Sequence, residues 1–332
     1  MPSSVAGDRG SGLSNFFSAP YQLHNHARLT HLESLGLPLA NRRVLELGSG
    51  PGDHTGFYME RGCAVVSVDA RQDCLDVLKQ RYPGAQAELC DLNDPTGLGP
   101  LGAFEVIHCY GILYHLEDPS QLIRYMGEAC TGLAVVETCV GVNRSQNPDI
   151  VEETIDDFTQ SSTGRGSRPM REWVFEALGR HFPCVYQTRT QPNHPEFPVN
   201  WKDLTNAPPL VRAVFVASKQ PLDLPTLSPG ILDVQQRLDP AVYSGVLESF
   251  LTEYRAILEE REQLCQRLHA TAADLRSQVD EKEQLIHRLD SIAAERLAAM
   301  LDRDREIEIR EQRIARLESI AAERLGDMLG RG

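Results

Sequence analysis

The stretch Val44–Gly52 constrains this chain more than any other, because it has the pattern of a buried apolar strand that runs into a glycine-rich turn. Gly48, Gly50 and Gly52 are separated by single residues, so the backbone can turn sharply and approach a ligand that any side chain would keep away. Glu46 lies at the carboxyl end of the strand, where open α/β sheets bind their ligands. We therefore predict that this turn holds a cofactor.

The glycine spacing leaves two alternatives open. A dinucleotide-binding fingerprint is also a glycine-rich turn, followed by an acidic residue about 20 positions later. Here the two-residue gap before the third glycine of that fingerprint is absent. An ordinary tight turn that binds no ligand is the second alternative.

Apolar strands alternate with helical segments after this turn. Residues 64–69 form a β-branched strand that ends in Asp69, whose carboxylate is placed to bind two ribose hydroxyls. Asp53 is expected to cap the helix before this strand, and Asp118 the helix before residues 133–137. Further strands are expected at residues 88–90, within 104–116, and at 133–137, 184–188 and 212–217. The alternation predicts an α/β fold with a doubly wound, mostly parallel sheet of seven strands.

The acidic-x-Gly-x-Gly-x-Gly pattern resembles the first motif of class I S-adenosylmethionine (AdoMet)-dependent methyltransferases. Asp69, Asp91 and the triplet Tyr114-His115-Leu116 match later places of that family in the same order, over residues 21–219. The resemblance implies a closing antiparallel pair of strands, a leading helix over the cofactor and an adenine contact at Asp91. It implies that AdoMet is bound by Glu46, Gly48, Ser49, Gly50, Gly52, Asp69, Ala70, Asp91, Leu92, Tyr110 and Gly111.

His115 is the expected general base, because it follows the fourth strand and imidazole titrates near neutral pH. A packing role for His115 is the alternative, and Glu137, His194 and Tyr21 are weaker candidates for the base. We expect the acceptor to be a hydroxyl of a sugar or glycan. A small metabolite or natural product is the rival acceptor, and a non-catalytic AdoMet-binding scaffold is the rival function.

Two later segments bear on the acceptor. Residues 141–168 are long for a connection between elements, so they are a candidate lid over the acceptor. Trp201 lies in a proline-rich loop, where it either stacks on a sugar face or packs into the core.

Composition narrows the classes of partner. The net charge of −14 argues against a nucleic-acid substrate. The 8 cysteines form no C-x-x-C pair, which favours reduced thiols, no metal site and a cytoplasmic location. No apolar run approaches the roughly 20 residues that a membrane span needs.

The last part of the chain has a heptad pattern. With Leu251 as position a, every seventh residue up to Met328 is apolar or small, whereas position d alternates between leucine and arginine. This predicts a coiled coil over residues 247–332, which would form a homo-oligomer or bind a partner protein. The expected organisation is a disordered segment 1–14, a methyltransferase domain 15–220, a proline-rich linker 221–246 and the coiled coil.

Overall fold

The computed structural model describes residues 11–142 and 148–329, without the side chains of residues 11, 240–258 and 324–329. The chain divides into two compact units, Met1–Leu251 and Thr252–Gly332, and each is described by itself. Most of the predicted disordered segment, residues 1–10, lies outside the described residues. Its last residues, Ser11–Ser14, form the short helix α1.

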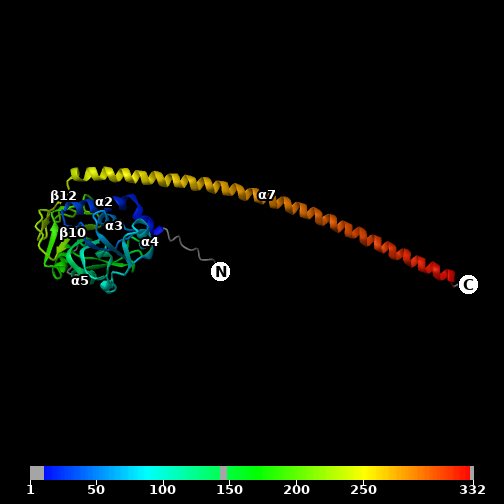
Figure 1. Cartoon of the computed structure of the whole chain (residues 1–332), viewed down its shortest axis with the longest axis horizontal. Coiled ribbons are helices and arrows are strands. Elements are labelled where there is room, and N and C mark those ends of the chain that lie inside the picture. The colour runs from blue at the N-terminus through cyan, green and yellow to red at the C-terminus, as the bar shows by residue number, and fades with distance from the viewer. Residues whose placement is uncertain (1–10, 143–147, 330–332) are drawn as a thin grey trace. The chain divides into compact units, whose positions relative to one another are not determined.

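The first unit is built on a mixed sheet of 8 strands in the order β11-β8-β10-β5-β4-β1-β2-β3. Figure 1 shows this unit as a ribbon, with β10 of the sheet labelled. Its strands are β1 (Arg43–Leu47), β2 (Ala64–Asp69), β3 (Gln86–Leu89), β4 (Phe104–Tyr110), β5 (Cys130–Val140), β8 (Cys184–Thr188), β10 (Val211–Ser218) and β11 (Leu227–Ser228). The run from β3 to β5 is parallel, and β10 pairs antiparallel with both β5 and β8. This is the predicted doubly wound sheet with its closing antiparallel pair, extended at one edge by β11.

Helices cover both faces of the sheet. They are α2 (Ala19–Ser34), α3 (Thr55–Met59), α4 (Gln72–Arg81), α5 (Pro119–Ala129) and α6 (Arg171–Gly179), with short 3-10 helices η1 (Asn15–Phe17), η2 (Pro95–Leu101) and η3 (Leu113–His115). One apolar core lies between the sheet and α5 and α6, and a second lies between the sheet and α2 and α3. The central strands are buried on both sides, as expected for a parallel sheet.

The alternation of side chains along β5 shows how one strand serves both cores. Leu133 and Val135 pack in the core of α2 and α3, whereas Ala134 and Val136 pack in the core of α5 and α6. Successive side chains of a strand point to opposite faces, so a continuous apolar run is what a strand covered on both sides requires.

The two capping predictions have opposite outcomes. The Asp118 carboxylate accepts a hydrogen bond from the Ser120 amide at 3.0 Å, which confirms it as the cap of α5. The prediction for Asp53 is wrong, because α3 begins after His54 without a side-chain cap. The Asp53 carboxylate instead pairs with Arg81 at 2.7 Å and accepts a hydrogen bond from Asn25.

Two small ribbons lie beside the main sheet. One pairs β6 (Asp149–Glu152) with β7 (Arg165–Arg168), and the other pairs β9 (Thr190–Gln191) with β12 (Gln236–Arg237). The segment expected to be a linker therefore packs on the domain up to β12: β11 joins the main sheet, and the Thr226 hydroxyl donates to the Leu35 carbonyl at 2.7 Å.

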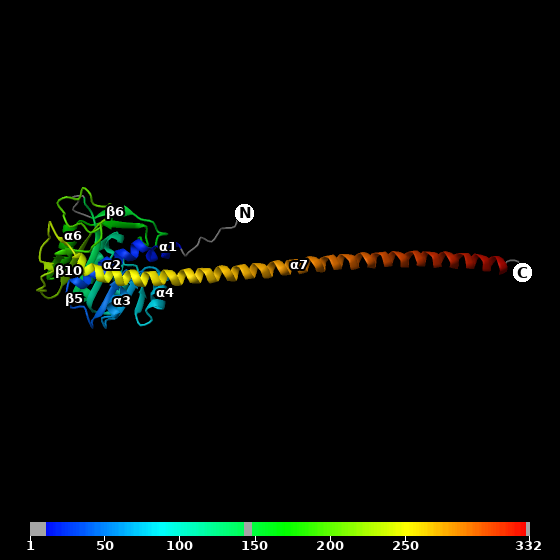
Figure 2. The ribbon, with the colours of Figure 1, turned by 90° about the horizontal axis from the view of Figure 1, so that it is seen from above.

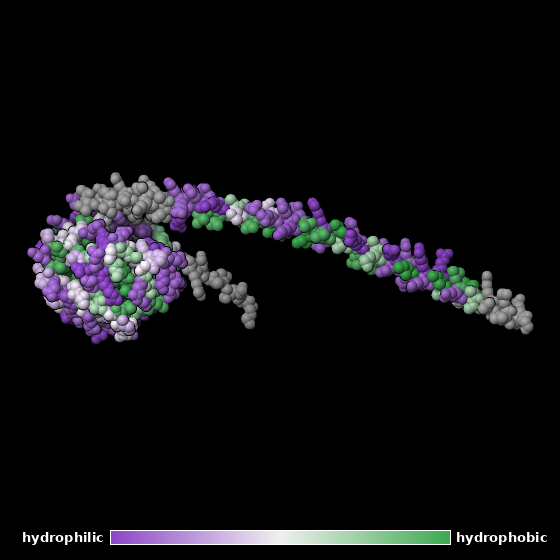
Figure 3. Space-filling view, in the orientation of Figure 1, coloured by the Kyte–Doolittle hydropathy of each residue, from purple (hydrophilic) through white to green (hydrophobic). Residues whose placement is uncertain are grey.

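The described residues of the second unit all lie in one helix, α7 (Pro240–Leu329), which is continuous and gently curved (Figure 2). Its 90 residues span about 135 Å at 1.5 Å each. All the described side chains of residues 259–323 are exposed, including apolar ones at the predicted a positions such as Ile286 and Ile314. Figure 3 shows hydrophobic and hydrophilic surface side by side along this helix. Among the described residues, no helix combines the length and the apolar character needed to cross a membrane.

Candidate active site

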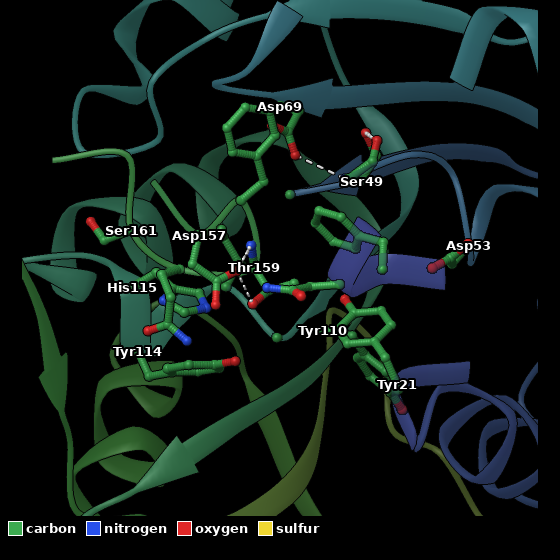
Figure 4. A pocket seen from close by; sticks show the side chains of 18 of the residues that line it. Tyr21, Ser49, Asp53, Asp69, Tyr110, Tyr114, His115, Asp157, Thr159 and Ser161 are labelled. Atoms are coloured by element: carbon green, nitrogen blue, oxygen red, sulfur yellow. Dashed lines mark hydrogen bonds between the residues drawn. The ribbon is translucent and has the colours of Figure 1, made fainter. Parts of the chain in front are cut away.

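A cavity of about 480 Å³ opens at the carboxyl ends of the parallel strands (Figure 4). The loops that follow β1, β2, β3 and β4 line it, together with α2, residues 157–162 and parts of residues 194–212. The chain passes from β1 to β2 on one side and places β4 on the other side. The cavity therefore lies at the topological switch point, where open α/β sheets bind their ligands.

The glycine turn is held by backbone hydrogen bonds. The amides of Gly48 and Ser49 both donate to the Val68 carbonyl, at 2.8 and 2.9 Å. Gly48 has a φ of +69°, and a Cβ atom there would lie 2.7 Å from the Ile112 side chain. Glycine is required here both for the backbone conformation and for the close approach of Ile112.

Asp69 organises this turn from the end of β2. Its carboxylate accepts hydrogen bonds from the amides of Gly50, at 2.8 Å, and Arg71, at 2.9 Å, while it lines the cavity. The sequence predicts only a ligand-binding role for the Asp69 carboxylate. The structure shows that it also fixes the loops on either side of it.

The predicted cofactor residues lie together, with two exceptions. The cavity is lined by Gly48, Ser49, Gly50, Asp69, Ala70, Asp91, Leu92, Tyr110 and Gly111. Glu46 is not among the lining residues: it is 1% exposed, and one carboxylate oxygen accepts hydrogen bonds from Thr55 and Ser67, at 2.6 and 2.7 Å. Its other oxygen has no partner among the described residues, and burial raises its pKa to about 7. Gly52 also lies outside the lining, where a Cβ atom would approach Leu78 and Tyr82.

His115 lies in the cavity wall, at the end of η3, and forms a pair with a carboxylate. Its Nδ1 is hydrogen-bonded to Glu153 Oε2. The Glu153 carboxylate also forms an ion pair with Arg168 at 3.3 Å and accepts a hydrogen bond from the Ser161 amide at 2.8 Å. Burial lowers the pKa of His115, although the Glu153 carboxylate opposes this effect. With its proton on Nδ1, the neutral ring has its lone pair on Nε2, as in the histidine of a carboxylate–histidine pair that acts as a base.

Glu153 was missed as a partner of His115. Burial alone would raise the pKa of Glu153, but the His115 ring, the Ser161 amide and Arg168 together lower it. The sequence contained a weak signal, because Glu153 belongs to the acidic run of the candidate lid.

The candidate lid reaches the cofactor side of the cavity as well as His115. Residues 157–162 line the cavity, and the Arg71 guanidinium donates to the carbonyls of Ile155, at 3.0 Å, and Ser161, at 3.3 Å. The same guanidinium lies 4.5 Å from the centre of the Phe158 ring. The candidate lid therefore packs on the loop after β2, beside Asp69, as well as on His115.

A buried ionic cluster lies under the other end of the cavity. Glu137 is fully buried between Arg28, at 2.8 Å, and Arg212, at 3.1 Å. Arg212 also donates to the hydroxyl of Tyr114 at 3.0 Å and to Glu196. Glu137 is thus occupied by two cations and does not line the cavity, so it is a poor general base. The sequence signal for this cluster was a charged residue inside each apolar strand, since Glu137 lies on β5 and Arg212 on β10.

The remaining candidates divide between wall and core. Tyr21 and His194 line the cavity, and so does His24 of the leading helix α2. Trp201 packs against the core, where its Nε1 donates to Gln235 at 2.6 Å, so it is not a sugar platform. The sequence predicts no metal ligands, but His24, His194 and Glu196 form a group with the donor atoms for a metal ion.

Comparison with known proteins agrees with this geometry. Residues 44–132, from β1 into β5, match the family model of a methyltransferase domain. The chain contains a methyltransferase domain. The match ends inside β5, so the lid, the closing strands and α7 lie outside it.

Two similar proteins share parts of this domain. An uncharacterized methyltransferase of Mycobacterium tuberculosis is 49% identical over 53 residues, which are 16% of this chain and 22% of that protein. A tRNA U34 carboxymethyltransferase of Shewanella piezotolerans is 32% identical over 123 residues, which are 35% of this chain and 37% of that protein. The chain thus spans well under half the length of these relatives.

Solved structures of similar proteins include methyltransferases described as S-adenosylmethionine-dependent. One from Mesorhizobium loti has 16% identity and a TM-score of 0.43, over 59% of this chain and 99% of the other. One described as putative, from Listeria monocytogenes, has 14% identity and a TM-score of 0.46, over 60% of this chain and 99% of the other. The fold of the domain is defined by its own strand order rather than by these weak matches.

Proposed function

We propose that this protein is an AdoMet-dependent methyltransferase that transfers a methyl group to a hydroxyl oxygen of a sugar or glycan. The observation that supports this most strongly is the shared cavity. Asp69 and the glycine turn line one part of it, and His115, which is paired with Glu153, lies in its wall. A cofactor and an acceptor bound there would lie next to each other.

The residues of the cavity fit AdoMet. Asp69 offers a carboxylate for ribose hydroxyls, and Asp91 offers one for an amino group. The Tyr110 hydroxyl and Arg28 Nε belong to side chains of the cavity wall and have no hydrogen-bond partner among the described residues. They leave two hydrogen-bond donors for the amino-acid end of a ligand. AdoMet would supply a methyl group that its positively charged sulfur already activates.

The protein's own chemistry is then to orient the acceptor and remove its proton. His115 Nε2 would accept the proton of the acceptor hydroxyl, and Glu153 would stabilise the charged imidazole that results. The lid residues 157–162 would exclude water from this step.

The sugar acceptor is supported by the polarity of the cavity wall. Tyr114, Gln160, His194 and Arg212 line it with hydrogen-bonding groups, which suit a ligand rich in hydroxyls. A small metabolite or natural product with one hydroxyl would use the same base. A non-catalytic AdoMet-binding scaffold would not need the His115–Glu153 pair.

We further propose that α7 forms a coiled coil with a copy of itself or with a partner protein. Its exposed a positions support this, because an apolar line of that length needs another helix to cover it. The free cysteines are those expected of a reducing compartment, which supports a cytoplasmic location.

The test is a transfer assay with methyl-labelled AdoMet and a glycan fraction from the source cells. We expect label in the carbohydrate, at a position that mass spectrometry assigns to an O-methyl group. Label only in small molecules would show that the acceptor is a small metabolite or natural product and not a glycan. No label in any fraction would favour the non-catalytic scaffold.

A further inference from the structure

We propose that His24, His194 and Glu196 form a binding site for a divalent transition-metal ion in the wall of the cavity. Each side chain offers one ligand atom, and these atoms lie within 4.8 Å of one another. His24 comes from α2, whereas His194 and Glu196 come from the loop before β10. The fold thus brings two distant segments together at this point, and all three residues line the cavity.

The environment of His24 gives the strongest support for a metal ligand at this point. Its side chain is nine-tenths buried, and its Nε2 has no hydrogen-bond partner among the described residues. The nearest carboxylate oxygen, Glu196 Oε2, is 3.9 Å away, which is too far for a hydrogen bond. A buried nitrogen without a hydrogen-bond partner destabilises the folded state, and a metal ion between these atoms would remove that cost.

The spacing of the three groups suits a metal. Ligand bonds of about 2.1 Å in a tetrahedral site place neighbouring donor atoms about 3.4 Å apart, so only small movements are needed. The rings of His24 and His194 already stack, with centroids 4.4 Å apart. His194 Nδ1 accepts a long hydrogen bond of 3.3 Å from the Glu196 amide. If His194 bound a metal through Nε2, its ring proton would lie on Nδ1, so this weak hydrogen bond would be lost.

The local charges permit a cation. Two arginines lie nearby, but Arg28 is paired with Glu137, and Arg212 is paired with both Glu137 and Glu196. The positive charges of the two arginines are therefore balanced by the negative charges of Glu137 and Glu196. Arg212 also orients Glu196, as groups behind a metal ligand commonly do.

The donor set indicates the class of metal and its use. Two imidazoles and one carboxylate suit Mn²⁺, Fe²⁺, Co²⁺ or Zn²⁺, and three protein ligands leave coordination positions open toward the cavity. An acceptor hydroxyl at an open position would have a lowered pKa and would lose its proton to His115 more readily. This role rests on the proposed function, whereas metal binding itself does not.

The test is a titration of the metal-free full-length chain with Co²⁺, followed by calorimetry and by visible absorption. We expect one ion per chain, a spectrum of nitrogen and oxygen ligation, and an affinity reduced about a hundredfold in His194→Ala and Glu196→Gln. His287→Ala, on the exposed surface of α7, is the matched control and should bind as the original chain does. Thermal unfolding confirms that each variant is folded.

Two outcomes overturn the proposal: no stoichiometric Co²⁺ binding by the original chain, or equal affinity in folded His194→Ala. The methyltransferase proposal fails separately. A chain that binds Co²⁺ through these residues but transfers no methyl group retains the metal site and loses only the proposed function. A chain that methylates an acceptor but binds no Co²⁺ retains the proposed function and loses only the metal site.

Discussion

The sheet of the domain buries its apolar residues, whereas the described part of the helix α7 exposes them. Val44 and Ile107 are fully buried between helices, whereas Ile286 and Ile307 of α7 are 56% and 49% exposed. The domain thus buries its own apolar surface and places some of its buried polar groups, such as Arg28, His115 and Arg212, around one cavity. The described side chains of the helix, at residues 259–323, include a regular apolar line and are all exposed. The difference suggests that chemistry belongs to the first unit and association to the second.

The largest effect is expected at the general base. His115→Asn should lower turnover by about 10²–10⁴-fold, because the acceptor proton would have no imidazole to receive it. Affinity for S-adenosylhomocysteine should stay nearly unchanged. Steady-state kinetics with the labelled cofactor measures the first quantity and calorimetry the second.

His269→Asn, the same change on an exposed side chain of α7, is its control and should leave turnover unaltered. If His115→Asn lost cofactor binding in the same proportion as turnover, His115 would have a structural role.

A smaller effect is expected on the pH dependence of stability. Glu46 has a pKa of about 7 in the folded protein against 4.5 as the ordinary value, so the folded state binds its proton more tightly than the unfolded state. The free energy of unfolding should therefore fall as pH rises from 4.5 to 7, by about 3 kcal/mol for the 2.5-unit difference.

Glu46→Gln, which resembles the protonated acid, should remove most of this slope. Denaturant unfolding at several pH values measures it, with Glu283→Gln on α7 as the exposed control. An equal slope in Glu46→Gln and in the original chain would show that Glu46 is ionised in the folded state.

The smallest effect is expected on association through α7. Ile286→Asp places a charge on the apolar a line, which should weaken self-association on the order of tenfold, since many other heptads remain. Ile309→Asp changes an exposed isoleucine that lies off the a and d lines, so it should have little effect. Analytical ultracentrifugation separates the two. A monomeric original chain at tens of micromolar would mean that α7 binds a different partner.

What the sequence could predict follows from the length of each pattern. The sequence predicts the strand Cys184–Thr188 with its observed bounds, because a short run with β-branched and aromatic residues directly after Pro183 is typical of a strand. The strands β11 and β12 have only two residues each and carry no such signal, so the sequence predicts a linker there. Contacts between distant residues were also out of reach. The pairing of Arg28 with Glu137 depends on how α2 packs over the end of β5, and no local pattern reports that.

The central claim is that the cavity around the glycine turn and Asp69 is an AdoMet site. Calorimetric titration of the full-length chain with S-adenosylhomocysteine tests it most directly. We predict one site per chain, about a hundredfold weaker in Asp69→Ala because two charge-assisted hydrogen bonds to the ligand are lost, and unchanged in Asp280→Ala on α7. Because Asp69 also holds the amides of Gly50 and Arg71, thermal unfolding must show that the variant is folded. No binding by the original chain, or equal affinity in folded Asp69→Ala, would contradict the account.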